Sequence, residues 1–130
     1  MLCLVFMRLL FADDNQETCN LFELVFRMEN IDAQFAHNGA EAVEAVREEA
    51  EAFDVIVLDV EMPVMNGWSA FKAIRELPQG QTVPIVIFTG YASIESRAWA
   101  KQLGAADIFF KPMLPDELLS RLRKIVEQKA

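Results

Sequence analysis

The sequence predicts an α/β fold in which helices cover both faces of a doubly wound, five-stranded parallel sheet. Short apolar runs alternate with segments of helical period along the 130 residues. Most of these runs are continuous rather than alternating, which is typical of strands buried on both faces. Strands that alternate with helices pair in parallel through right-handed crossovers. Strand order 2-1-3-4-5 is one doubly wound arrangement of five such units, and it is the order we expect.

Five segments have the composition of strands. Four of them are short, β-branched or aromatic and nearly continuous in apolar residues, whereas 31–36 alternates and indicates an edge strand. The expected strands are 7–12, 31–36, 54–59, 84–89 and 106–110.

The segments between these strands repeat apolar residues at helical spacing, which predicts five helices. We expect the fourth, 93–104, to end at Gly104, and the fifth to begin near Pro115, where proline and acids suit a first turn. The apolar positions are Leu21, Leu24, Val25 and Met28 in the first helix; Ala42, Val43 and Val46 in the second; Phe71, Ile74 and Leu77 in the third; and Leu118, Leu119, Leu122, Ile125 and Val126, expected to be buried, in the fifth.

Composition narrows the classes of function. The net charge of −8 and the pI of about 4.6 argue against direct nucleic-acid binding. Cys3 and Cys19 have no metal-ligand spacing and fit a reducing cytoplasm. No stretch reaches the roughly 20 apolar residues of a membrane helix. We expect one cytoplasmic domain over 7–130, with 1–6 as an apolar extension that could precede a natural start at Met7.

Chemically active side chains follow four of the predicted strands. Asp13 and Asp14 come after the first strand, Asp59 ends the third, Thr89 ends the fourth and Lys111 follows the fifth. Ligands of doubly wound sheets bind outside the carboxyl ends of the strands. These five side chains are therefore expected to meet at one edge of the sheet.

Three carboxylates at one edge predict a divalent cation. Like charges raise each other's pKa unless a cation intervenes, and hard oxygen ligands select Mg²⁺ or a similar ion such as Mn²⁺. A lysine and a hydroxyl would complete a pocket for a phosphoryl group, because phosphoryl transfer depends mainly on positioning and charge stabilisation. Asp59, at a central strand end, is the natural nucleophile for an aspartyl-phosphate.

Four motifs carry a resemblance to a known family. They are "ADDN", "VIVLDVEMPVMNGW", "PIVIFTG" and "GAADIFFKP", in that order. Over 7–130 the chain resembles a response-regulator receiver domain of two-component signal transduction. The resemblance implies a flavodoxin-like (βα)5 fold and a switch that takes a phosphoryl group from a histidine kinase or a phosphotransfer protein.

The same resemblance assigns the acids. Asp59 resembles the phosphoacceptor, and Asp14 and Asp59 resemble direct metal ligands, with Asp13 acting nearby, often through water. The backbone carbonyl of Glu61 would supply a further ligand. Glu61 and Tyr91 each lie two residues beyond a site residue and are expected to tune dephosphorylation.

The remaining roles also come from the resemblance. Thr89 resembles the switch hydroxyl that closes on the phosphate, and Lys111 resembles the lysine that pairs with the phosphate. The peptide bond between Lys111 and Pro112 is expected to be cis. Pro63 and Gly67 match the turn after the acceptor strand, where glycine would permit a positive φ.

One position departs from the family pattern. An aromatic residue commonly lies three positions before the lysine and changes rotamer on activation, but here that position holds Ile108. Phe109 and Phe110 are near, and strand alternation sends them in different directions. His37, the sole histidine, follows the edge strand and is a poor phosphodonor, so the donor is another protein or a small molecule.

Other functions remain open beside this one. A haloacid-dehalogenase-type phosphatase would want an aspartate where Glu61 stands and would place its nucleophile on the first strand. A receiver-fold interaction module could work without phosphorylation, and an FMN binder would need hydroxyls and glycines in place of the acids at 13–14. As a switch, the chain would catalyse only its own phosphoryl transfer and autodephosphorylation. The surface of its fourth helix, fifth strand and fifth helix would then change, for a downstream output protein or a homodimer.

Overall fold

The computed structural model describes residues 7–49, 53–90 and 93–129, and within them the predicted fold class is confirmed. The strands form one parallel sheet in the order β2-β1-β3-β4-β5. The edge position of β2 also agrees with its alternating sequence. The strands are β1 (Arg8–Ala12), β2 (Asp32–Ala36), β3 (Val55–Asp59), β4 (Ile85–Thr89) and β5 (Asp107–Phe110).

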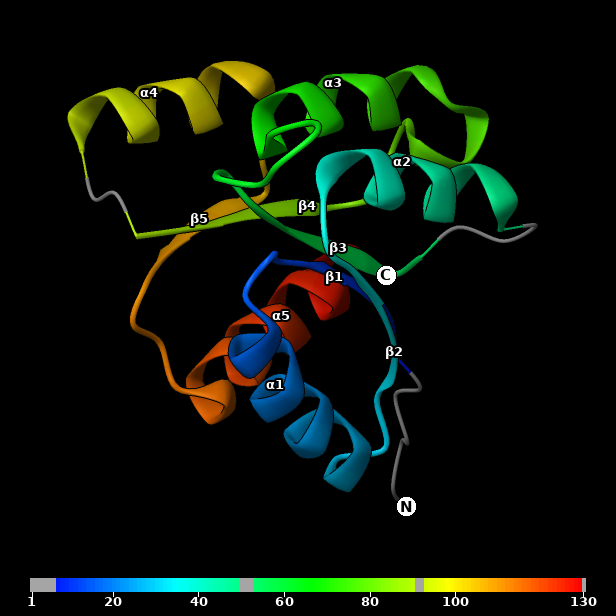
Figure 1. Cartoon of the computed structure of the whole chain (residues 1–130), viewed down its shortest axis with the longest axis vertical. Coiled ribbons are helices and arrows are strands. Elements are labelled where there is room, and N and C mark those ends of the chain that lie inside the picture. Colours follow the sequence, from blue (N-terminus) through cyan, green and yellow to red (C-terminus); the bar gives the residue numbers. More distant parts are fainter. Residues whose placement is uncertain (1–6, 50–52, 91–92, 130) are drawn as a thin grey trace.

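Helices lie on both faces of the sheet. Helices α2, α3 and α4 cover one face, and α1 and α5 cover the other (Figure 1). A short 3-10 turn at Pro78–Gly80, which the sequence had not indicated, follows α3. The helices are α1 (Gln16–Met28), α2 (Gly39–Glu48), α3 (Gly67–Glu76), α4 (Ile94–Leu103) and α5 (Pro115–Lys129).

Polar caps fix where the first four helices begin. Asn15, Asn38, Asn66 and Ser93 each accept a hydrogen bond from the backbone N–H three residues further on. Such a cap stabilises a helix by about 1 kcal/mol. Helix α4 ends as expected at Gly104, which adopts a left-handed conformation with φ of 83°.

The core consists of two apolar layers separated by the sheet. On the side of α2, α3 and α4, strand residues such as Leu10, Ile56 and Ile87 pack against helix residues. On the side of α1 and α5, Phe11 and Phe88 contact rings from α1. Every residue of β3 and β4 is buried, as their continuous apolar sequences predicted.

The first helix has the predicted location but buries a different face. Of the four positions that gave the helical period, Leu21, Leu24 and Met28 are 51%, 55% and 71% exposed, whereas Val25 is partly buried. The buried residues of α1 include Phe22, whose ring stacks on Phe11, and Phe26, whose ring meets Phe11 in a T-shaped arrangement. Two apolar stripes compete in this helix, and the phenylalanines bury more apolar surface per residue.

The last helix agrees with its prediction in part. Leu118, Leu119 and Leu122 are buried, whereas Ile125 and Val126 are only partly buried against the same layer. Within the described residues, no helix has both the length and the apolar character needed to cross a membrane.

Candidate functional site

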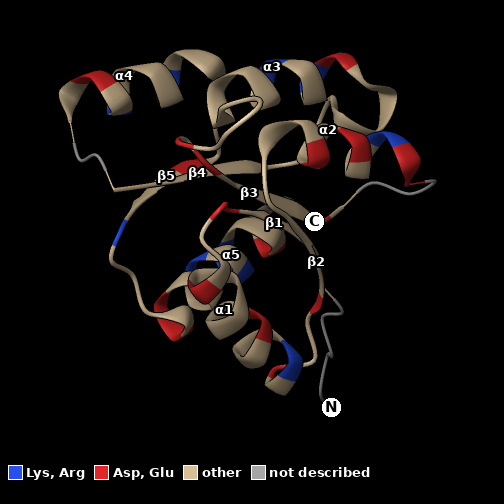
Figure 2. Cartoon of the chain, in the orientation of Figure 1, with Lys and Arg blue, Asp and Glu red and all other residues tan. Residues whose placement is uncertain are grey.

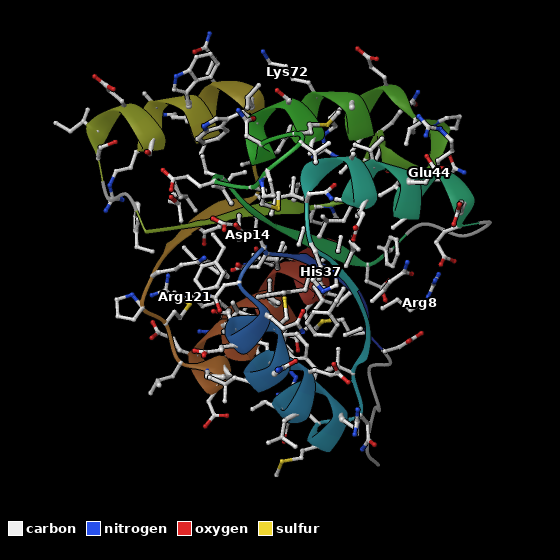
Figure 3. The ribbon with its side chains drawn as sticks, in the orientation of Figure 1. Arg8, Asp14, His37, Glu44, Lys72 and Arg121 are labelled. Atoms are coloured by element: carbon white, nitrogen blue, oxygen red, sulfur yellow. The ribbon has the colours of Figure 1, made fainter. Side chains whose placement is uncertain are left out.

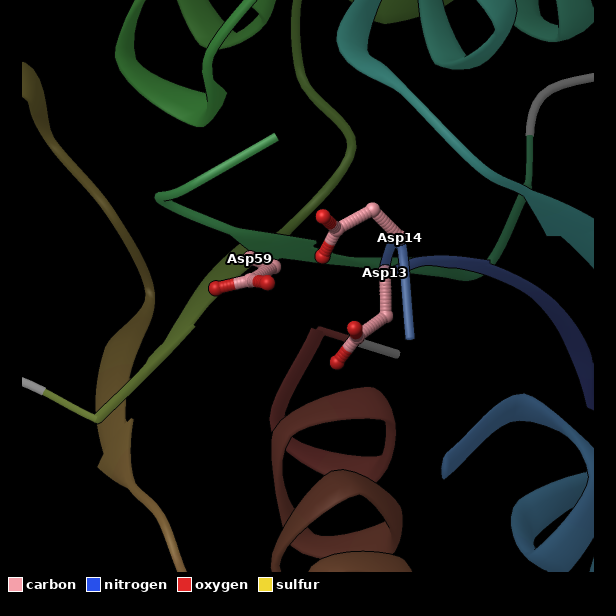
Figure 4. Close-up of side chains that lie close together, drawn as sticks. All are labelled: Asp13, Asp14 and Asp59. Carbon is pink, nitrogen blue, oxygen red and sulfur yellow. The ribbon is translucent and has the colours of Figure 1, made fainter. Parts of the chain in front are cut away.

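The three predicted acids meet where β1 and β3 end. Asp13 and Asp14 form the turn between β1 and α1, and Asp59 is the last residue of β3. Each can offer a carboxylate oxygen such that these oxygens all lie within 4.8 Å of one another (Figure 4). Asp13 is fully buried and Asp59 is 5% exposed, while Asp14 is exposed. Figure 2 shows acidic residues in red at the ends of β1 and β3, and Figure 3 labels Asp14 near the end of β1.

The start of α1 holds the Asp13 turn in place. The Asn15 N–H donates to Oδ1 of Asp13 at 2.9 Å, while the Asn15 side chain caps α1 by accepting from the Thr18 N–H at 2.9 Å. The Cys19 thiol donates to the backbone oxygen of Asp13 at 3.3 Å. Burial, with Asp13 next in importance, raises the pKa of Cys19 to about 11, so the thiol keeps the proton that it donates.

The loop after β3 is packed tightly against Asp59. The Gly67 N–H donates to the Val60 oxygen at 2.9 Å, and a Cβ atom at residue 67 would lie 2.2 Å from the Asp59 carbonyl oxygen. The expectation that Gly67 has a positive φ is wrong, since this close approach is what requires glycine there. Among the described residues of this loop, the left-handed conformation belongs to Val64, with φ of 67°.

A lysine bridges two of the three acids. The ammonium of Lys111 lies 2.8 Å from Oδ2 of Asp13 and 3.3 Å from Oδ2 of Asp59, and 5.1 Å from the centre of the Phe88 ring. The Lys111–Pro112 bond is cis, as expected. Burial alone would lower the pKa of Lys111, but its hydrogen bond and attraction to Asp13, joined by those to Asp59, raise it above the usual value. The ammonium therefore stays charged.

Asp59 has a higher pKa than an ordinary aspartate. Burial raises its pKa from 3.8 to about 6, and the charge of Asp13 adds to this, although Lys111 acts in the opposite direction. The Glu61 N–H, 3.4 Å from Oδ1, favours the charged form weakly. At neutral pH the side chain is mostly an ionised carboxylate, ready to act as a nucleophile.

All six residues predicted for the site line one cavity of about 360 Å³. Thr89, 1% exposed at the end of β4, is among them, as is Glu61. The further lining residues Asn15, Thr18 and Gly90 were not predicted. Asn15 carried a signal in the sequence, since asparagine directly before an apolar-periodic segment is typical of a helix cap, and Gly90 ends the motif "PIVIFTG".

The donor set of this cavity fits a hard divalent cation. The three acids supply carboxylate oxygens. His37, the one histidine of the sequence, is not a further ligand, because it follows β2 and its Nδ1 lies 3.3 Å from a carboxylate oxygen of Glu41. Mg²⁺ is typically held by one or two protein carboxylates together with waters and phosphate oxygens, so three acids suffice. Lys111, already bound to two of the acids, offsets part of their mutual repulsion.

Strand β5 presents three apolar side chains near the lysine. Ile108 is partly buried in the layer that α4 covers. Phe109 is buried on the opposite side, with the Arg121 guanidinium 5.5 Å from its ring. Phe110 pairs with Thr89 across the sheet and has the Arg97 guanidinium of α4 4.5 Å from its ring. Tyr91, the other residue expected to tune dephosphorylation, lies outside the described residues.

Comparison with known proteins identifies a family and supports the fold. A family model described as the response regulator receiver domain matches residues 9–123. The chain is 31% identical over 122 residues to an uncharacterized transcriptional regulatory protein, YclJ, of Bacillus subtilis. The receiver domain of Francisella response regulator 1452 superposes with a TM-score of 0.85 at 28% identity, over 95% of this chain and 99% of that one.

A second solved structure is relevant to the acids. The receiver domain of the sensor histidine kinase PA1611 from Pseudomonas aeruginosa, described with a magnesium ion coordinated in its active-site cleft, has a TM-score of 0.84 at 27% identity. The match covers 95% of this chain and 99% of that one. By contrast, the YclJ match covers 94% of this chain but 52% of YclJ, so the chain spans about half of the length of that relative.

Proposed function

The chain belongs to the response-regulator receiver domain family, and we propose that it works as a phosphorylation-controlled switch in a phosphorelay. The observation that carries the proposal is the site itself. A buried aspartate with a pKa of about 6 lies at a central strand end, with two further acids and a lysine gathered around it. Phosphoryl transfer needs a nucleophile in line and charge stabilisation around it, and these groups supply both.

In the proposed reaction an ionised oxygen of Asp59 attacks the phosphorus of the donor. A new P–O bond forms, the bond from phosphorus to the donor breaks, and the leaving group keeps that electron pair. Lys111, held charged beside Asp59, would pair with one phosphoryl oxygen, and the Thr89 hydroxyl would donate to another. Asp59 then carries an aspartyl-phosphate.

We assign the divalent ion to Asp14 and Asp59 as direct ligands, with Asp13 nearby and the Glu61 carbonyl as a further ligand. The magnesium described in the PA1611 receiver supports this assignment. When bound, the ion supplies positive charge for the transferring phosphoryl oxygens. Asp14 is exposed, so an ion from solution can reach it directly. Asp13 is buried and accepts a hydrogen bond from the Asn15 N–H, which suits a role near the ion rather than as a direct ligand.

The proposed donor is a histidine kinase or a histidine phosphotransfer protein. Helix α1 begins at the mouth of the cavity, where Asn15 and Thr18 line it, and it exposes Leu21, Leu24 and Met28. A protein donor has to cover that mouth to deliver its phosphoryl group. This exposed apolar stripe, on the helix that begins at the cavity, is therefore the proposed docking face for the donor.

The proposed consequence is a shift in the population of two conformations at α4, β5 and α5. A downstream output protein or a second copy of the chain would read that surface. The net charge of −8 favours a protein partner over nucleic acid for this domain, although relatives twice its length are named transcriptional regulators. With such a donor, the proposed location of the switch is the cytoplasm.

The test is exposure of the chain to acetyl phosphate with Mg²⁺. The wild-type chain should gain the mass of one phosphoryl group, and both Asp59→Asn and removal of Mg²⁺ with EDTA should abolish the gain. A wild-type chain that stays unlabelled would favour the alternative, a receiver-fold interaction module that works without phosphorylation. Sustained turnover of p-nitrophenyl phosphate would instead indicate a phosphatase.

A further inference from the structure

Helix α4 is attached to the rest of the molecule by few buried side chains. The buried residue recorded in this helix is Ala100, and Leu103 is partly buried in the same layer. Trp99 is 46% exposed and leans on Trp68 of α3, with ring centroids 6.2 Å apart and planes at 33°. The Lys72 ammonium lies 5.6 Å from the centre of the Trp99 ring. The tryptophan pair is thus a direct contact between α3 and α4.

Trp68 is tied firmly to the phosphoacceptor strand. It follows Gly67, whose Cα lies against the Asp59 carbonyl so closely that a Cβ atom would be 2.2 Å from that oxygen. The Gly67 N–H also donates to the Val60 oxygen at 2.9 Å. Buried residues of α3 such as Phe71 and Ile74 anchor the helix to the core. Trp68 therefore moves with the loop that joins Asp59 to α3, which we call the acceptor loop.

Trp99 lies on the helix that comes next in the chain after a strand of the site. Helix α4 follows β4 in the chain, and β4 ends at Thr89, one of the residues that line the cavity. On β5, Ile108 is partly buried in the layer that α4 covers and has no aromatic ring. The aromatic contact from β5 to α4 is instead that of Phe110 with Arg97.

We propose that the Trp68–Trp99 pair couples the acceptor loop to α4 and helps to set the balance between the two conformations of the switch. The inference rests on the proposed function and names how that site is regulated. One ring moves with the residues next to Asp59 and the other moves with α4. A displacement of α4 relative to α3 must therefore restack or separate the rings, so their packing free energy enters the balance.

The experiment uses beryllofluoride with Mg²⁺ as the probe of the occupied site. Two tryptophans at this separation give a coupled circular-dichroism signal, which Trp68→Phe and Trp99→Phe should each abolish. In the wild type, beryllofluoride should change this signal, and Asp59→Asn should prevent the change. Trp99→Ala should alter the beryllofluoride concentration at half-saturation by about threefold or more, the size expected for one aromatic pair. Lys101→Ala, an exposed change on the same helix, should leave it unaltered.

Half-saturation is best followed by the NMR signals of residues near Asp59, which do not depend on tryptophan. If these signals respond while the coupled signal stays constant, or if Trp99→Ala shifts half-saturation by less than about threefold, the coupling role is contradicted and the proposed switch survives. If the signals near Asp59 do not respond in the wild type, the proposed function itself fails. Thermal unfolding of Trp99→Ala checks that the half-exposed position tolerates the change.

Discussion

At the scale of single residues, the raised pKa of Asp59 makes stability depend on pH. Because the folded state binds this proton more tightly than the unfolded chain, its contribution is full below pH 3.8 and is lost as the pH rises through about 6. The difference corresponds to at most about 3 kcal/mol, at about 1.4 kcal/mol per pKa unit. At neutral pH the ionised, buried carboxylate thus lowers the stability of the folded state, and the site retains it because its chemistry needs a nucleophile.

Asp59→Asn should therefore stabilise the chain in metal-free buffer. At pH 7.5 we expect its free energy of unfolding to exceed that of the wild type by about 1–3 kcal/mol, and the gain should shrink toward zero near pH 4. Urea unfolding in EDTA at several pH values measures the difference in the free energy of unfolding and its change with pH. Parallel curves for the two proteins would show that Asp59 does not titrate in this window.

Val64 offers a second test at this scale. A β-branched residue with φ of 67° is strained by about 1–2 kcal/mol, and Val64 is 84% exposed, so little packing would be lost on replacement. Asparagine tolerates the left-handed region, so Val64→Asn should raise the free energy of unfolding by about 1 kcal/mol. Val64→Ala, which keeps most of the strain, is the matched control. Equal stability of the two variants would argue against strain at this residue.

The residues of the site could be predicted because strand ends in a parallel sheet share one edge. That logic is enough to bring Asp13, Asp59 and Thr89 together. It could not give the reason for Gly67, because a 2.2 Å approach to the Asp59 carbonyl is a tertiary contact between segments whose path is unknown from sequence. The expectation of a left-handed residue in this loop rested on the conformational freedom of glycine, which pointed to Gly67, whereas the structure has Val64 in that conformation.

At the scale of elements, the start of α3 and the end of β3 behave as one unit. Gly67→Ala should push the Asp59 carbonyl away and destabilise the chain by about 1–3 kcal/mol, the usual cost of overpacking. Because that shift displaces Asp59, labelling by acetyl phosphate should fall as well. Gly90→Ala is the matched control for stability, since a Cβ atom there meets nothing within 4 Å. Unfolding and labelling that match the wild type for both variants would contradict the tight packing.

The existence and order of the elements could be read from the chain, but the buried face of α1 could not. Leu21, Leu24 and Met28 form as regular a stripe as Cys19, Phe22 and Phe26. Rings from three strands, those of Phe11, Phe35 and Phe88, contact the phenylalanine stripe and so decide which stripe is covered. Periodicity identifies a helix, whereas its orientation depends on partners that lie elsewhere in the sequence.

At the scale of the whole molecule, the site concentrates negative charge within a chain of net charge −8. A divalent cation that binds only the folded state adds RT ln(1 + [L]/Kd) to stability, which is about 2.7 kcal/mol at a hundred times Kd. Millimolar MgCl2 should therefore raise the melting temperature of the wild type. Asp14→Asn should lose most of that gain.

Sodium chloride at matched ionic strength separates ion binding from screening of the acidic surface. If it raises the melting temperature as much as MgCl2 does, or if Asp14→Asn responds to MgCl2 like the wild type, the acids do not form a magnesium site.

The account rests most of all on Asp59 as the phosphoacceptor, and the most direct measurement locates the phosphoryl group. The chain is treated with acetyl phosphate and Mg²⁺, the acyl phosphate is reduced with borohydride, and the modified residue is found by peptide mass mapping. We predict reduction at Asp59 alone, since its ionised carboxylate lies beside Lys111 at the centre of the cavity. Reduction at Asp13 or Asp14 with Asp59 unmodified would contradict the account.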